Sequence, residues 1–232
     1  MRIFLSFFIF SVIAVLVIIT GSKGTSFLSI TQTFNLYILV ISGFRSTFTP
    51  HFNQNKTIVM QDFVHLHVHT YYSILDGQSS IENLVEKAVA NGMKGMAITD
   101  HGNMFGTKEF YNYCKRVNAR LKAEGKPAFK PIIGCEMYVA HRKKTDKVFE
   151  KGDRSSYHLI VLAKNYTGYK NLIKLVSRSW VDGFYMRPRT DREDLERFHE
   201  GLIVCSACIA GEVPRKILSG DMEGAREAVE WY

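Results

Sequence analysis

The sequence predicts an α/β protein in which a parallel sheet or barrel is covered by helices. Short apolar stretches alternate with longer stretches of helical periodicity over five units between residues 63 and 206. Capping and stop residues separate the two kinds of stretch, as at Ser79 to Glu82 and at Gly92. With 232 residues, 46% of them hydrophobic, the chain is long enough for one domain with a packed core.

The individual elements follow from these stretches in chain order. Strands are expected at 63–69, 95–99, 131–139, 157–162 and 202–206. Helices are expected from the capping box to about residue 91, and at 108–122, 168–181, 191–198, 212–218 and 221–232. The charged segment 142–154 is interpreted as a solvated loop. The last helix reaches the final residue without a stop signal, so we expect the chain to end within the fold.

The first 59 residues differ in composition from the rest and are expected to form a separate apolar extension. They contain four basic residues and no Asp or Glu, whereas residues 60–232 contain 26 basic and 22 acidic residues. Residues 3–19 form a nearly unbroken apolar run that resembles a signal-peptide core or a short membrane span. Two explanations stay open: upstream sequence read in frame before a true start at Met60, or a membrane anchor. The mildly basic remainder permits nucleic-acid binding without arguing for it.

Three alternating histidines in the first expected strand are the strongest functional signal. Side chains alternate between the faces of a strand, so His65, His67 and His69 are expected on one face. A row of imidazoles is costly to bury without partners, and a metal ion removes that cost by binding the ring nitrogens. The turn at Asp76-Gly77 adds a carboxylate shortly after the strand.

Further candidate ligands lie on or next to the later strands. In parallel α/β folds, functional side chains gather at the carboxyl ends of the strands. His101 follows the second strand, Glu136 lies in the third, His158 is near the start of the fourth, and Cys208 follows the fifth. Mixed nitrogen, oxygen and sulfur donors suit zinc and other divalent metals, and so many donors predict two or three ions. Closely spaced metals favour phosphoester hydrolysis.

Each candidate also has an ordinary structural explanation. His101 could cap a helix, Glu136 could pair with a surface lysine, and His158 could be a core histidine. The cysteines are too sparse for a disulfide scaffold, so metal binding or simple burial is favoured for them, and Cys205 is expected in the core. The four cysteines are Cys114, Cys135, Cys205 and Cys208.

Several segments together resemble the polymerase and histidinol phosphatase (PHP) domain family. They are His67-Val68-His69, Asp76-Gly77, Thr99-Asp100-His101-Gly102-Asn103, Lys130 to Glu136, and Tyr157 to Ala163. Gly183-Phe184-Tyr185, Pro188-Arg189 and Gly201 to Cys208 look like the branch found at the amino terminus of bacterial replicative DNA polymerase III alpha subunits. The resemblance covers residues 60–232.

The resemblance implies a distorted (β/α)7 barrel with a trinuclear metal cluster, of which the carboxyl-terminal part is missing here. The ions would be zinc, manganese or magnesium. It carries metal-ligand roles onto His67, His69, Asp76, His101, Glu136, His158 and Cys208. It gives no such role to His65. A later Asp-x-His ligand pair and the polymerase palm lie beyond the last residue.

The implied function is that of the front end of a DNA-directed DNA polymerase, a nucleotidyltransferase, whose PHP site acts as a metal-dependent 3′–5′ exonuclease. The implied partners are DNA, the rest of the polymerase chain and other replisome subunits, in the cytoplasm; a membrane is a partner only if residues 3–19 are translated. Two alternatives stay open: a metal-stabilised scaffold without turnover, and a stand-alone PHP phosphatase.

A possible path for single-stranded DNA is indicated by Arg187 and Arg189, which lie beside Phe184 and Tyr185. The alternative is a solvated loop held by Pro188.

Overall fold

The computed structural model describes residues 63–152 and 155–232. The expectations for residues 1–59, including the membrane or signal-like run at 3–19, lie outside this part of the chain. Among the described residues, no helix has both the length and the apolar character needed to cross a membrane.

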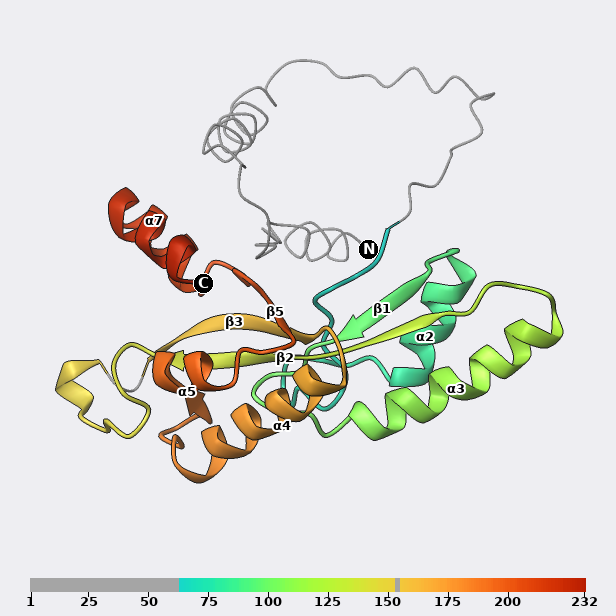
Figure 1. Ribbon diagram of the computed structural model, residues 1–232, viewed down its shortest axis with the longest axis horizontal. Coiled ribbons are helices and arrows are strands. Elements are labelled where there is room, and N and C mark those ends of the chain that lie inside the picture. The colour runs from blue at the N-terminus through green and yellow to red at the C-terminus, as the bar shows by residue number, and fades with distance from the viewer. Residues whose placement is uncertain (1–62, 153–154) are drawn as a thin grey trace, which may run out of the picture. The chain divides into compact units, whose positions relative to one another are not determined.

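Helices and strands alternate through most of the described chain (Figure 1). The helices are α2 (Ile81–Ala90), α3 (Thr107–Ala123), η2 (Phe149–Lys151), α4 (Tyr166–Val181), α5 (Arg192–Arg197), α6 (Glu212–Leu218) and α7 (Met222–Trp231). The strands are β1 (Gly95–Ile98), β2 (Lys130–Ala140), β3 (Ser156–Ala163), β4 (Arg189–Thr190) and β5 (Leu202–Cys205). The α/β prediction is confirmed, and most predicted bounds agree with these within two residues. Strand β4 was not predicted, because two residues carry no periodicity.

The five strands form one mixed sheet in the order β1-β2-β3-β5, with β4 paired to β2. Strand β2 runs parallel to β1 and β4, whereas β3 is antiparallel to both β2 and β5. The prediction of a parallel sheet is therefore wrong for β3. A parallel return needs a crossover connection, usually a helix, but the described residues of the loop between β2 and β3 carry only η2. The closed (β/α)7 barrel remains a prediction.

The predicted strand at 63–69 is an extended segment beside β1 rather than a regular strand. His65 forms an isolated parallel bridge with Met96, and the N–H of Thr99 donates to the carbonyl of Val68 at 2.8 Å. The N–H of Val68 donates to Oγ1 of Thr99 at 3.0 Å. Because a side chain accepts this bond, the ladder is interrupted while the segment stays alongside β1.

Two clusters of buried side chains hold the helices to the sheet. One joins α2 and α3 to β1 through Ile81, Val85, Ile98 and Phe110. The other packs Leu172 and Leu175 of α4 against Met137 of β2 and Leu159 of β3. The first cluster lies next to β1, which is followed by His101, and the second lies next to β2 and β3, which carry Glu136 and His158, so the packed core fixes the position of the site.

The charged segment 142–154, interpreted as a solvated loop, contains a buried lysine. Lys144 is 5% exposed, and its Nζ lies 2.9 Å from Oδ2 of Asp194. The backbone N–H of Lys144 donates to Asp191 at 2.9 Å. The interpretation is wrong at this position because α5 supplies buried carboxylates that no local sequence pattern could assign to the loop.

Candidate metal centre

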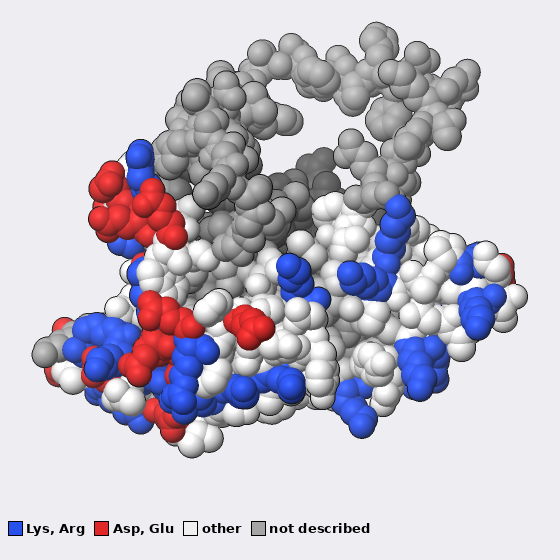
Figure 2. Space-filling model, viewed as in Figure 1, with Lys and Arg blue, Asp and Glu red and all other residues white. Residues whose placement is uncertain are grey.

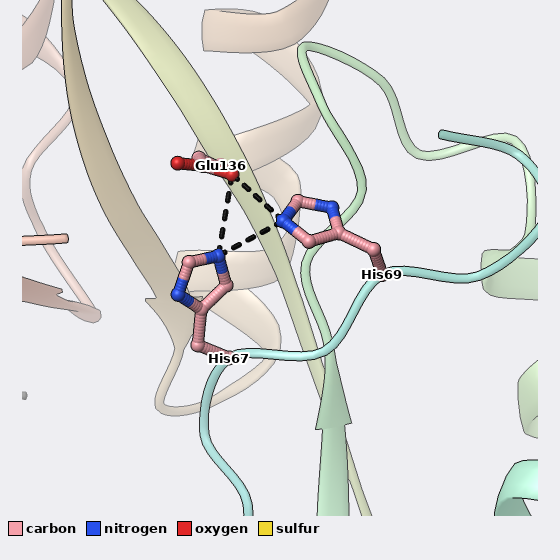
Figure 3. A group of neighbouring side chains, drawn as sticks. All are labelled: His67, His69 and Glu136. Carbon is pink, nitrogen blue, oxygen red and sulfur yellow. Dashed lines mark hydrogen bonds and ion pairs between the residues drawn. The ribbon is translucent and has the colours of Figure 1, made fainter. Parts of the chain in front are cut away.

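His67 and His69 lie on one side of the extended segment and face Glu136 of β2 (Figure 3). Their Nε2 atoms lie 3.2 Å and 2.9 Å from Oε2 of Glu136, and 3.0 Å from each other. The side chains of His67 and His69 thus keep the alternation expected for a strand, although this segment does not form a regular hydrogen-bond ladder with β1. His65 is exposed and packs its ring against Phe63, outside this group.

His101 reaches the same carboxylate from the loop after β1. The Nδ1 atom of His101 lies 3.1 Å from Oε2 of Glu136. This nitrogen is buried and has no hydrogen-bond partner in the part of the chain that the structure describes. The Nε2 atom of His101 lies 2.5 Å from Oδ2 of Asp76, whose side chain is 63% exposed. His101 thus connects the buried carboxylate to the acidic residue at the outer edge of the site.

His158 approaches the other oxygen of Glu136. Its Nδ1 lies 2.7 Å from Oε1 of Glu136 and 3.7 Å from Sγ of Cys208. His158 is near the start of β3, and in a parallel sheet the start of a strand would lie at the edge remote from the site. The antiparallel pairing of β2 and β3 brings it to the same edge as the end of β5, where Cys208 follows.

The electrostatics of the site depend on this one carboxylate. Burial opposes ionisation of Glu136, yet hydrogen bonds from His158 and His67 hold its pKa well below the usual range. Burial also disfavours the charged form of His158, but hydrogen bonds to Cys208 and Glu136 raise its pKa to about 9. Burial lowers the pKa of His101. The His158 contact lowers the pKa of the Cys208 thiol against the opposing effect of burial.

Three overlapping groups of side chains have donor atoms close enough together to hold a metal ion. Within each group the donor atoms lie within 4.8 Å of one another. The groups are His67, His69 and Glu136; His69, Asp76 and His101; and His101, Glu136 and His158. Cys208 is outside these groups and adjoins the third through His158.

The protonation of His69 tests whether these residues fit a cation. Oγ of Ser73 donates its proton to Asp100 at 2.6 Å, so Nδ1 of His69, at 2.9 Å, must donate to Ser73. A neutral His69 then carries its lone pair on Nε2, which faces Oε2 of Glu136. Two lone pairs at this distance repel each other, and a metal ion between such donors removes the repulsion. The residues therefore fit a divalent cation.

Asp100 and Ser73 support the site and were not predicted in this role. Asp100 is 2% exposed and accepts hydrogen bonds from the N–H and hydroxyl of Thr70 and from Ser73. Ser73 also accepts from the backbone N–H of His101 at 3.1 Å. These bonds tie the two histidine-bearing segments together. The position of Asp100 beside His101 was the available signal, whereas nothing in the sequence marks Ser73.

The two arginines proposed to contact DNA occupy different environments. Arg189 is fully buried, and its guanidinium donates to the backbone carbonyls of Gly183, Lys144 and Asp146. It is therefore inaccessible to a nucleic acid, and the DNA-contact expectation is wrong for this residue. Arg187 is exposed, and its guanidinium carbon lies 4.8 Å from the centroid of the Tyr138 ring. That ring lies 5.1 Å from the ring of His158.

Comparison with known proteins gives one family and a consistent set of relatives. The PHP domain model matches residues 65–232. DNA polymerase III subunit alpha from Borreliella burgdorferi is 49% identical over 173 residues, which cover 73% of this chain and 14% of that protein. The Treponema pallidum subunit is 47% identical over 170 residues, with the same coverage. An amidohydrolase of known structure from Chromobacterium violaceum gives a TM-score of 0.31 at 16% identity, over 72% of this chain and 54% of that one.

This chain thus spans about one seventh of the length of the curated relatives it matches. The structural similarity to the amidohydrolase is too low to support an inference.

Proposed function

Because this chain belongs to the PHP domain family, we propose that it is the amino-terminal part of a bacterial replicative DNA polymerase alpha subunit. We propose that its site is a metal-dependent phosphoesterase that removes nucleotides from a 3′ end. The observation that carries this proposal is the buried carboxylate of Glu136, in contact with ring nitrogens of His67, His69, His101 and His158. The relatives named DNA polymerase III subunit alpha support the polymerase context.

The site would hold two or three divalent ions of zinc, manganese or magnesium. Nitrogen, oxygen and sulfur donors together suit such ions. Bound ions of this kind supply an activated water and stabilise both the attacking and the leaving oxygen of a phosphodiester. The proposed ligands are His67, His69, Asp76, His101, Glu136, His158 and Cys208.

The chain's own residues would prepare the site for this chemistry. Ser73 fixes the proton of His69 on Nδ1, so that Nε2 is free to bind. Glu136 presents Oε2 to one set of histidines and Oε1 to His158. Exposed Arg187 lies at the rim and can neutralise a backbone phosphate of the substrate.

The polymerase context extends the proposal beyond this site. DNA, the rest of the polymerase chain and other replisome subunits are the proposed partners, and the cytoplasm is the proposed location. The nucleotidyl-transfer centre would belong to the remainder of the protein.

The test is metal-dependent trimming of a labelled single-stranded oligonucleotide by the complete protein. The double substitution His67→Ala/His69→Ala should abolish trimming, while His65→Ala, which changes an exposed histidine of the same segment, should leave it intact. Trimming that survives the double substitution would contradict the proposal. A wild-type protein that is stabilised by metal but never trims DNA would assign the ions to a structural role instead.

A further inference from the structure

Three exposed aromatic side chains form a continuous surface beside the candidate metal centre. Phe105, Trp180 and Phe184 are 64%, 42% and 44% exposed, respectively. The centroid of the Trp180 ring lies 6.1 Å from that of Phe105 and 5.7 Å from that of Phe184, with which it stacks. We call these three residues the aromatic ledge. Contiguous apolar surface of this kind typically marks a binding site.

Hydrogen bonds fix the aromatic ledge to the metal centre. Nε1 of Trp180, at the end of α4, donates to the carbonyl of Gly102 at 2.8 Å. The N–H of Gly102 donates to the carbonyl of Glu136, also at 2.8 Å. Because Gly102 directly follows His101, the central ring of the aromatic ledge is held two hydrogen bonds away from the backbone of Glu136.

The exposed Arg187 near the aromatic ledge favours an anionic ligand. Arg187, three residues after Phe184, is exposed and forms no ion pair with any residue at 63–152 or 155–232. The ledge joins the start of α3 to the end of α4, where the charge of Arg178 is balanced by its ion pairs with Asp182 and Asp194. Figure 2 shows Lys and Arg spread along α3, whereas acidic side chains of this face lie over α7 and around α5 and α6.

We propose that the aromatic ledge stacks the unpaired bases of single-stranded DNA whose 3′ end lies in the metal centre. Exposed aromatic rings beside a cationic side chain are the usual means of binding single strands without sequence preference. Phe105 and Phe184 offer the outer faces for the bases, and Arg187 contacts the backbone phosphate. This inference rests on the proposed function, because it assigns the substrate position for the same site.

The test uses the complete protein with the double substitution Phe105→Ala/Phe184→Ala. Trp180 is left in place because its indole holds the loop of His101. We expect KM for trimming of a single-stranded oligonucleotide to rise about tenfold or more, in line with the loss of base stacking. Hydrolysis of bis(p-nitrophenyl) phosphate, a small phosphodiester that does not reach the ledge, should be unchanged. Tyr166→Ala is the matched control, since Tyr166 is an exposed aromatic residue at the other end of α4.

A second measurement reports stacking without turnover. An oligonucleotide with 2-aminopurine at its 3′ end and phosphorothioate linkages that resist cleavage should lose fluorescence on binding the wild-type protein. The double substitution should abolish this quenching. Phe105→Leu/Phe184→Leu keeps apolar bulk but no ring, so it should behave like the alanine variant if stacking is the cause.

The outcomes separate this inference from the proposed function. Normal oligonucleotide KM and normal quenching in both double variants would overturn the aromatic ledge as a base-binding surface while leaving the phosphoesterase intact. A lowered melting temperature of the complete protein with normal quenching would also overturn it, and would assign the ledge to contact with the rest of the polymerase chain. If the wild-type protein never trims DNA, the proposed function fails, and quenching alone then decides whether the ledge binds bases.

Discussion

Nδ1 of His158 lies 2.7 Å from Oε1 of Glu136 across the antiparallel pair of strands β2 and β3. The register pairs Glu136 with Ile160 and Tyr138 with His158, so Glu136 and His158 are diagonal neighbours on one face of the sheet. The other oxygen, Oε2, faces His67, His69 and His101. Glu136 therefore links His158 on β3 to the three histidines of the extended segment and of the loop after β1.

Replacing this carboxylate should disrupt metal binding at more than one position. Glu136→Gln keeps the size of the side chain but removes its charge and one acceptor oxygen. We expect metal affinity to fall by more than the roughly 10- to 100-fold typical of losing an outer-shell partner. Metal content after dialysis, measured by inductively coupled plasma mass spectrometry, checks this. Glu109→Gln, which affects only the bonds to Tyr71 and Tyr72, should retain the wild-type content.

Ser73, which is not one of the proposed ligands, should also affect metal affinity. Ser73→Ala removes the acceptor for Nδ1 of His69 and the donor to Asp100. The ring of His69 then loses its fixed tautomer, and metal affinity should fall roughly 10- to 100-fold. Competition titration with a chromophoric chelator measures the loss.

Ser80→Ala provides the contrasting control for Ser73. Ser80 caps α2 by accepting a hydrogen bond from the N–H of Asn83, so its loss should cost about 1 kcal/mol of stability. Its metal affinity should remain normal. Equal metal affinity in the two serine variants would rule out the orienting role of Ser73.

Metal removal should lower the melting temperature of the protein. An ion that binds only the folded state adds about 2.7 kcal/mol of stability at a free concentration roughly 100 times its Kd. Differential scanning calorimetry with and without a chelator measures the effect. In His67→Ala/His69→Ala the same chelator should change the melting temperature much less, and an equal shift in both proteins would show that the ions bind elsewhere.

The sequence predicted which side chains form the site more completely than it predicted the strand directions of the sheet that brings them together. Alternation placed His67 and His69 on one side, because that periodicity is a local property of extended chain. The direction of β3 was missed because it depends on whether the loop after β2 contains a crossover helix, which the charged composition of that loop does not disclose. Ser73 and Trp180 were missed as supporting residues because their partners, Asp100 and Gly102, are distant in sequence. Burial of Arg189 likewise depends on carbonyls from two separate loops.

The buried ion pairs between α5 and the loop after β2 should dominate local stability. Asp194 is 2% exposed and contacts Nζ of Lys144 at 2.9 Å and Nε of Arg178 at 3.0 Å. Asp194→Asn leaves the buried Lys144 with Asp191, at 3.7 Å, as its one charged partner within residues 63–152 and 155–232. We expect a loss of about 3 kcal/mol in the free energy of unfolding, measured by urea denaturation. Asp182→Asn, at a half-exposed partner of Arg178, should cost less than about 1 kcal/mol.

The pH dependence of stability gives an independent measure of the same carboxylate. Burial opposes ionisation of Asp194, but Lys144 and Arg178 hold its pKa below the ordinary value. A carboxyl whose pKa is lower in the folded state stabilises fully above its unfolded pKa of about 3.9. That contribution is lost as the pH falls through the folded pKa. The stability difference between the wild-type protein and Asp194→Asn should therefore be constant near neutral pH and shrink below about pH 4. A difference that stays constant into strong acid would mean that the charge of Asp194 contributes nothing, and that the substitution acts through packing alone.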